Sequence, residues 1–246
     1  MSADGHKKSI ASPGVGNYVT VAKALASARA LLGDESIRQR SFVQAHGTST
    51  PQNRVTESHI LNETAKAFGI ENWPVAAIKA YLGHSIGASA GDQLMATLGL
   101  WSDGFIPGIA TIDHVAEDVY DSNLQFSSEH VEVGPEGIDS AILNSKGFGG
   151  NNASATVIAP HIVNKMLAKK HSGDVMKCYL DRNEAVRERA AAYDEAANRA
   201  EGLPIYKFNH NVLNGDDLGL SSREITVPGY DQAIDLDVTS PYADLL

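Results

Sequence analysis

The sequence has little cysteine, because Cys178 is the only one among its 246 residues. One cysteine excludes an intrachain disulfide and any zinc site built from several cysteines. The nine histidines are spread along the chain with no His-x-x-x-His pair among them. We therefore expect no metal site.

Long hydrophobic runs and an excess of basic residues are also lacking. No run approaches the roughly 18 apolar residues that a membrane-spanning helix requires. Lys and Arg number 20 against 30 acidic residues, so the formal net charge is −10. This charge disfavours nucleic acid and anionic membranes as partners. The sequence starts without the apolar segment of a secretion signal, so we expect a cytoplasmic protein.

Helical and β-like patterns alternate over residues 1–160, which predicts an α/β fold. Helices are expected at 17–32, 54–68 and 87–100, the last of them buried. Strands are expected at 41–44, 75–78, 131–133, 140–144 and 153–158.

The composition of the sequence changes after Pro160. Two helices are expected there, at 161–171 and 183–201, and the chain becomes polar and irregular beyond Gly202. Residues 216–246 hold seven acidic side chains against one basic side chain, Arg223. We interpret this stretch as a solvated arm, so the predicted domains are 1–160 and a C-terminal extension, 161–246.

Three motifs can carry chemistry, and two of them contain a histidine. His46 follows a predicted strand, and His84 lies at the predicted start of a helix, where the helix dipole disfavours an imidazolium ion. Two neutral histidines in one pocket could form an oxyanion hole for a thioester or an enolate. A Lys79–Glu57 pair could lock the geometry of that pocket; the alternative is that Glu57 is a solvated carboxylate on a helix.

The segment around His84 also allows a different chemistry, because Gly83–Gly87 reads Gly-His-Ser-Ile-Gly. This matches the G-x-S-x-G turn of serine hydrolases, with Ser85 as the nucleophile. The strand before such a turn should run up to it, whereas the apolar run 75–78 ends five residues before Gly83. The hydrolase stays open as an alternative.

Together the motifs His46–Pro51, Lys79–Ala88 and Gly147–Asn152 resemble, in order and spacing, the β-ketoacyl-acyl-carrier-protein synthases of the thiolase-like superfamily. The resemblance extends over about residues 1–158, including the start Met1–Gly5. It covers only the C-terminal half of the family's catalytic unit. It implies half of a thiolase-like fold, a mixed sheet between helices, followed by a helical and irregular extension.

This resemblance implies a decarboxylative Claisen condensation of malonyl-acyl carrier protein with an acyl thioester in fatty-acid synthesis. The family uses a Cys-His-His triad, and His46 and His84 match the two histidines. Lys79 and Glu57 match the lysine and glutamate that hold the centre. The implied partners are acyl carrier protein, a complementary N-terminal half and a second copy in a homodimer of the complete enzyme. No resident cofactor is implied, since phosphopantetheine arrives on the carrier protein.

Five further positions match substrate-binding residues of the family. Thr48 and Thr50 match threonines that line the phosphopantetheine channel. Phe148 matches a gating phenylalanine between the triad and the acyl pocket. Gly147 and Gly149 flank Phe148 and would supply the backbone freedom that a moving gate requires.

The sequence also departs from the family pattern. The nucleophilic cysteine belongs to the absent half, and Cys178 lies in a segment without the small-residue elbow that such a nucleophile needs. We therefore expect that this chain cannot condense substrates alone. The alternative is a non-catalytic partner subunit of the chain-length-factor type. Arg54 stands where aspartate is usual, and Lys146 stands where phenylalanine is frequent.

Overall fold

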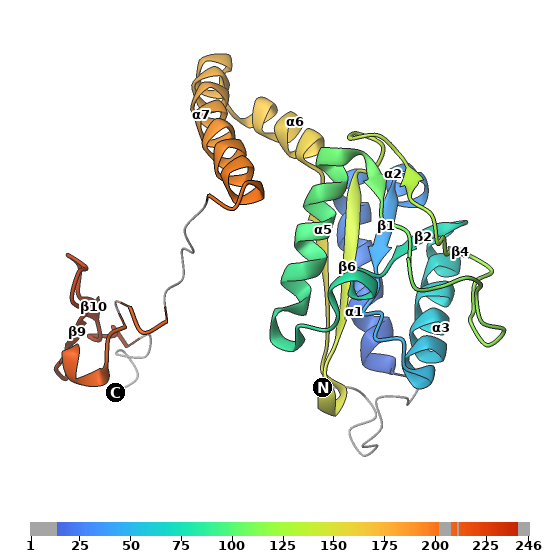
Figure 1. The fold of residues 1–246 in the computed structure, drawn as a ribbon, viewed down its shortest axis with the longest axis horizontal. Helices are drawn as coiled ribbons and strands as arrows, with labels where there is room; N and C mark the ends of the chain where they lie inside the picture. The colour runs from blue at the N-terminus through green and yellow to red at the C-terminus, as the bar shows by residue number, and fades with distance from the viewer. Residues whose placement is uncertain (1–13, 202–207, 211, 241–246) are drawn as a thin grey trace. The chain divides into compact units, whose positions relative to one another are not determined.

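The computed structural model describes residues 14–201, 208–210 and 212–240, except for the side chain of Phe148. The described residues divide into two compact units, with the boundary between Cys178 and Tyr179 (Figure 1). The start that resembles the family, Met1–Gly5, lies outside the described residues. The boundary between predicted domains after residue 160 stays a prediction.

The first unit is built around a five-stranded mixed sheet with the strand order β4-β2-β1-β6-β7. The first four strands of this order are parallel, and β7 is antiparallel to β6. A separate pair, β3 and β5, is antiparallel. The strands are β1 (Ser41–Gln44), β2 (Trp73–Ala76), β3 (Phe105–Ile106), β4 (Leu124–Gln125), β5 (Val131–Glu132), β6 (Ser140–Lys146) and β7 (Asn152–Ile158).

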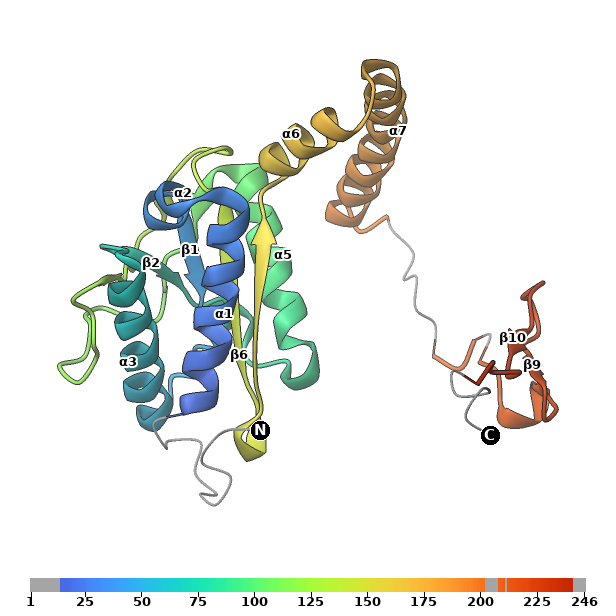
Figure 2. The same cartoon turned by 180° about the vertical axis from the view of Figure 1, so that it is seen from behind.

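Helices cover both faces of this sheet, which confirms the predicted α/β fold with a mixed sheet between helices (Figures 1 and 2). The helices and turns of the unit are α1 (Val15–Leu32), α2 (Asp34–Gln39), α3 (Pro51–Phe68), α4 (Lys79–Leu82), η1 (Ile86–Ala88), α5 (Ser89–Asp103), η2 (Phe148–Gly150) and α6 (Pro160–Lys170).

Alternation along the central strands creates two hydrophobic cores. On β1, Val43 packs with α1 and α3, whereas its neighbour Phe42 packs with Leu100 and Trp101 of α5. Strand β1, which leads to His46, is therefore buried on both faces, so packing holds its C-terminal end.

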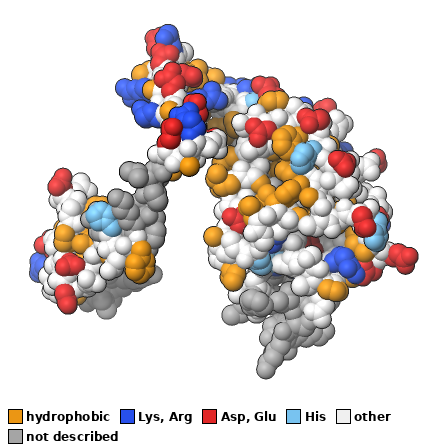
Figure 3. All heavy atoms as spheres, viewed as in Figure 1, with side chains coloured by type: hydrophobic (Ala, Val, Ile, Leu, Met, Phe, Trp, Pro, Cys, Tyr) orange, Lys and Arg blue, Asp and Glu red, His pale blue; other side chains and the backbone are white. Residues whose placement is uncertain are grey.

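The outward side of α5 is apolar and exposed, which differs from the prediction of a buried helix. Leu94, Met95 and Leu98 are 38%, 69% and 45% exposed, whereas Gln93 and Thr97 of the same helix are fully buried against the sheet. Leu82 and Ile86, on the segment before α5, are also exposed. We call these five apolar residues the α5 face; Figure 3 shows hydrophobic side chains gathered over this helix.

The second unit contains most of α7 (Gly173–Asn198), which starts ten residues before the predicted helix. Cys178 of α7 is exposed. A turn, η3 (Gly215–Asp217), precedes a small sheet with the order β10-β9-β8. Its strands, β8 (Gly219–Leu220), β9 (Glu224–Thr226) and β10 (Ile234–Asp235), were not predicted. None of the helices that the structure describes is long and apolar enough to cross a membrane.

Candidate active site

His46 lies just beyond the C-terminal end of β1, where the chain leaves the sheet, and it is 6% exposed. Its backbone is held from both sides. The peptide N–H of His46 donates to Glu57 Oε1 at 2.7 Å, and the ammonium of Lys79 donates to the carbonyl oxygen of His46 at 2.6 Å. The position of this residue is therefore fixed independently of its ring.

Glu57, on α3, is a buried carboxylate that accepts four hydrogen bonds. Its Oε1 accepts from His46 N and from Asn144 Nδ2, both at 2.7 Å. Its Oε2 accepts from Gly47 N and Asn53 Nδ2, both at 2.9 Å. Glu57 therefore ties α3 to the His46 loop and to β6.

The predicted Lys79–Glu57 pair takes a different form in the structure. The two side chains hold the same residue, His46, but Glu57 accepts its backbone N–H and Lys79 donates to its carbonyl oxygen. Lys79 gives its hydrogen bond to the carbonyl of His46, and the oxygens of Glu57 are engaged by the four N–H donors. Glu57 is 4% exposed, so the alternative of a solvated carboxylate is wrong.

His84 lies in the exposed loop between α4 and η1, five residues before α5 begins. The helix that was predicted to begin at His84 therefore begins five residues later, at Ser89. The dipole of this helix does not hold the His84 ring. Instead, its Nδ1 accepts the backbone N–H of Ile86 at 3.1 Å. Ile86 has a φ of +55°, a left-handed conformation that is rare for a β-branched residue. This strained backbone presents the N–H to His84.

The two rings lie together, with centroids 5.3 Å apart and planes at 85°. His46 Nδ1 accepts the backbone N–H of Lys146 at 3.3 Å, just as His84 Nδ1 accepts a backbone N–H. A neutral imidazole whose Nδ1 accepts carries its proton on Nε2. The hydrogen bonds therefore assign the same tautomer to both rings, and each ring has an Nε2–H left to donate.

Burial, more than the surrounding charges, keeps the His46 ring neutral. Burial is the main cause that lowers the pKa of His46, to about 4, and Lys79, His84 and Lys146 lower it further, while Glu57 opposes them. Burial likewise lowers the pKa of Lys79 and of Lys146. A buried imidazole that cannot be protonated near neutral pH can act as a hydrogen-bond donor at Nε2.

The depressed pKa of His46 predicts an acid-sensitive fold. Between pH 6.5 and about 4 the unfolded chain binds a proton at His46 more strongly than the folded one, so acid favours unfolding. We expect the free energy of unfolding to fall by about 3 kcal/mol across this window because of His46. Urea unfolding followed by the fluorescence of Trp73 and Trp101 would measure this at several pH values. In the variant His46→Gln this contribution should vanish, and parallel curves for the two proteins would contradict the prediction.

Two of the predicted substrate-binding residues, Thr48 and Thr50, lie in the loop between His46 and α3, and their roles stay predictions. Thr48 is half-buried in the loop after His46. The Thr50 side chain caps α3 by accepting the N–H of Asn53 at 3.3 Å, and Pro51 takes the first helical position. The helix therefore begins three residues before the predicted start.

The gate candidates occupy a tight turn between β6 and β7. Gly147 N–H donates to Asn151 O at 2.7 Å, and Gly149 has a φ of +76°, which suits glycine. Phe148 begins η2, and its side chain lies outside the described part of the structure.

The hydrolase alternative gains no support from the geometry of Ser85. Its hydroxyl donates to Asp92 Oδ2, an acceptor that cannot serve as the histidine base of a serine nucleophile. Ser85 also lies in an exposed loop after α4, not at the end of a strand.

Sequence reasoning missed three amides that build the site. Asn53 and Asn144 hold Glu57, and Gln93 of α5 donates to the carbonyl oxygens of Ala45 and Asn144 at 2.8 and 3.0 Å. Gln93 thus ties together the ends of β1 and β6. The only available signal was that Asn144 lies three residues before the third motif; nothing in the local pattern marks the other two.

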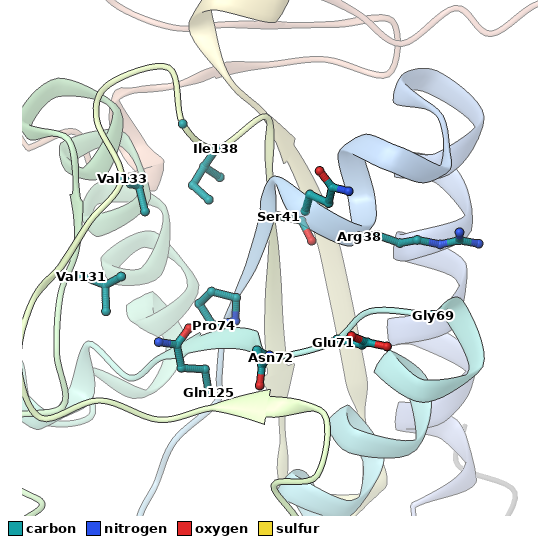
Figure 4. Close-up of a pocket in the computed structure, with 12 residues that line it drawn as sticks. Arg38, Ser41, Gly69, Glu71, Asn72, Pro74, Gln125, Val131, Val133 and Ile138 are labelled. Carbon is teal, nitrogen blue, oxygen red and sulfur yellow. The ribbon is translucent and has the colours of Figure 1, made fainter.

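A surface pocket of about 580 Å³ lies elsewhere, at the N-terminal ends of the parallel strands (Figure 4). No predicted site residue lines it. Its lining includes Arg38, Ser41, Glu71, Pro74, Gln125 and Ile138. Among the residues that the structure describes, no cluster of three or more His, Cys, Asp or Glu could hold a metal ion.

Comparisons with known proteins connect this chain to a protein family. Residues 1–113 match the family model "Beta-ketoacyl synthase, C-terminal domain". The chain carries a β-ketoacyl synthase C-terminal domain. This confirms the predicted family, and His46 and His84 both lie within the matched range.

Individual β-ketoacyl synthases extend the match. The chain is 45% identical over 246 residues to the β-ketoacyl-[acyl-carrier-protein] synthase FabY of Pseudomonas aeruginosa, covering 100% of this chain and 39% of FabY. Over 113 residues it is 31% identical to 3-oxoacyl-[acyl-carrier-protein] synthase 1 of Escherichia coli, covering 46% of this chain and 26% of that protein.

The crystal structure of FabY from P. aeruginosa, described as a noncanonical ketosynthase, confirms the thiolase-like fold. It matches with a TM-score of 0.82, covering 100% of this chain and 38% of that chain. The segment after residue 160 therefore has a counterpart in FabY. This chain spans well under two thirds of the length of these relatives.

Proposed function

We propose that this chain supplies the two catalytic histidines of a 3-oxoacyl-[acyl-carrier-protein] synthase. The observation that carries the proposal is the pair of adjacent rings, in each of which Nδ1 accepts a backbone N–H and leaves Nε2–H as a donor. The family resemblance implies malonyl-acyl carrier protein as the substrate of these donors, and the match to a β-ketoacyl-[acyl-carrier-protein] synthase supports that assignment.

In the proposed reaction, His46 and His84 donate hydrogen bonds to the thioester carbonyl oxygen of the malonyl group. The bond between the malonyl Cα and the carboxylate carbon breaks, and CO₂ leaves. The electron pair of the broken bond stays with the Cα and forms an enolate with the thioester carbonyl. Two neutral donors stabilise the enolate oxygen without giving up their protons. The enolate carbon then attacks an acyl group carried on a cysteine thioester, and the cysteine leaves as a thiolate. Phosphopantetheine of the carrier protein would pass Thr48 and Thr50 to reach this site, with Gly147–Gly149 at the acyl pocket.

The nucleophilic cysteine must come from a complementary half, so the chain alone does not condense substrates. The α5 face supports this part of the proposal. Exposed apolar side chains along one helix are expected at an interface rather than against water. The chain also spans 39% of FabY, which leaves ample sequence for a second half. The complete enzyme is proposed to form a homodimer.

The decisive test is an assay of the protein complete with its complementary half. The intact protein should form a 3-oxoacyl product and release CO₂ from malonyl-acyl carrier protein and an acyl thioester. Absence of both products from a folded protein that contains a cysteine in the complementary half would overturn the proposal.

A non-catalytic partner subunit is the second candidate, since Cys178 is the only cysteine here. A purely structural subunit has no need of two histidines with matched tautomers, which favours the catalytic assignment. A complementary half without a cysteine would decide for the partner subunit.

The interface on the α5 face leads to a separate prediction. Met95 is 69% exposed, so Met95→Glu should leave the fold of this chain intact while placing a charge inside the proposed interface. We expect association with the complementary half to weaken by about tenfold or more, because an unpaired buried charge is costly. Analytical ultracentrifugation of separately expressed halves would measure this. The matched control is Lys66→Glu, at an exposed position of α3. Equal association of both variants with the complementary half would contradict the prediction.

A further inference from the structure

Lys146 occupies a position that the family resemblance gives to phenylalanine, and it contacts the candidate site through two separate groups. Its backbone N–H donates to His46 Nδ1 at 3.3 Å. Its ammonium donates to Asn53 Oδ1 at 2.8 Å. A phenylalanine would make the first contact but not the second.

The second contact returns to His46 through a chain of hydrogen bonds. Asn53 Nδ2 donates to Glu57 Oε2 at 2.9 Å, and Glu57 Oε1 accepts the N–H of His46 at 2.7 Å. Lys146, Asn53, Glu57 and His46 thus form a closed ring of hydrogen bonds, which we call the Lys146 ring. Asn53, Glu57 and His46 are each no more than 6% exposed, so water competes little for these bonds.

The hydrogen bonds form two branches, and each branch runs from a donor of Lys146 to an acceptor oxygen of Glu57. The carboxylate of Glu57 requires an N–H from Asn53, which leaves the Asn53 oxygen turned toward Lys146. An ammonium at that point satisfies the oxygen and increases the polarity of the amide, so each bond strengthens the next. A neutral apolar residue at position 146 would leave a buried carbonyl oxygen without this partner.

We propose that Lys146 is a positioning residue that fixes the His46 ring and its loop through Asn53 and Glu57. This inference rests on the proposed condensing function, because a fixed His46 imidazole serves to aim its Nε2–H at the substrate. The backbone N–H of Lys146 binds Nδ1 of the His46 imidazole, whereas the substrate would bind at Nε2. Lys146 itself therefore does not contact the reacting atoms.

Charged and titratable groups face His46 from every neighbouring element. They are Glu57 on α3, Lys79 on α4, His84 in the loop before η1, and Lys146 at the end of β6. Lys146 and Lys79 disfavour the imidazolium form and Glu57 favours it. Removing the Lys146 charge should therefore raise the pKa of His46.

The test compares Lys146→Met with Lys146→Arg in the intact protein, and Lys66→Met, which removes an exposed lysine of α3, is the matched control. Hydrogen–deuterium exchange at His46 Cε1, followed by peptide mass spectrometry across pH, reports the His46 pKa without any substrate. In Lys146→Met we expect this pKa to rise and kcat to fall by about 10- to 100-fold, with KM for malonyl-acyl carrier protein unchanged. Lys146→Arg should restore both.

The outcomes separate this inference from the function beneath it. If Lys146→Met matches Lys66→Met in both the titration and kcat, the positioning role is overturned. If the wild-type protein forms no 3-oxoacyl product, the proposed function fails, and the His46 titration still decides whether Lys146 controls this ring. Should Lys146→Met fail to fold, Lys146→Gln carries the same test, since it removes the charge but keeps an N–H for Asn53.

Discussion

Replacing His84 by alanine is expected to lower kcat for condensation by about 10²- to 10³-fold, the usual cost of removing one preorganised donor to an oxyanion. The loss should appear in kcat more than in KM, because the charge on the oxygen develops only in the transition state. The ring of His84 is exposed in this chain, so its removal should leave the fold intact. The measurement is steady-state condensation by the intact protein.

Ser85→Ala provides the matched control for this result, because Ser85 is the exposed neighbour of His84. A condensing enzyme should keep nearly full activity in Ser85→Ala and lose it in His84→Ala. Unchanged condensation in His84→Ala would refute the role of the paired rings. Loss of activity in Ser85→Ala together with labelling of Ser85 by a fluorophosphonate would revive the hydrolase.

Local sequence was sufficient for several elements of the fold. Strand β1 was predicted at its observed bounds, because four consecutive residues are buried on both faces of the sheet. The end of α1 was predicted because Gly33, with a φ of +86°, stops the helix. Each of these signals depends only on residues adjacent in the chain.

Elements fixed by distant contacts were placed less well. Strand β2 begins at Trp73 and includes Pro74, two residues before the predicted strand, because the Trp73 N–H bonds to Asn123 O far along the chain. The apolarity of α5 was visible in the sequence, but the sequence does not say which side of the helix finds a partner. Met95 and Leu98 consequently remain exposed on a helix that was expected to be buried.

The residues of the candidate site likewise fall into those that local motifs predicted and those that only distant contacts bring together. His46 and His84 stood out because short motifs surround them, and the structure brings their rings together. Asn144 and Glu57 are 87 residues apart, so their hydrogen bond could not be inferred from either segment alone. The direct pairing expected for Lys79 and Glu57 became an indirect one, because each side chain binds the backbone of His46 instead.

The same network makes Glu57→Gln the variant with the largest expected effect on stability. Each oxygen of Glu57 accepts two N–H donors, one pair from His46 and Asn144 and the other from Gly47 and Asn53. A glutamine amide retains one oxygen and turns an NH₂ group toward the other pair, in either orientation. Two buried donors then lack an acceptor, which should cost about 2–5 kcal/mol of unfolding free energy.

Rotation of the Asn53 amide could relieve one of these donors only by breaking its bond to Lys146, since Asn53 Oδ1 already accepts the lysine ammonium. The loss in Glu57→Gln should therefore persist, and it can be measured by urea unfolding followed through Trp73 and Trp101, both buried in the same unit. Glu117→Gln, at an exposed loop position, should change stability by less than about 0.5 kcal/mol. Equal stability of the two variants would mean that Glu57 does not hold the His46 loop, and the ring of contacts around His46 would lose its anchor.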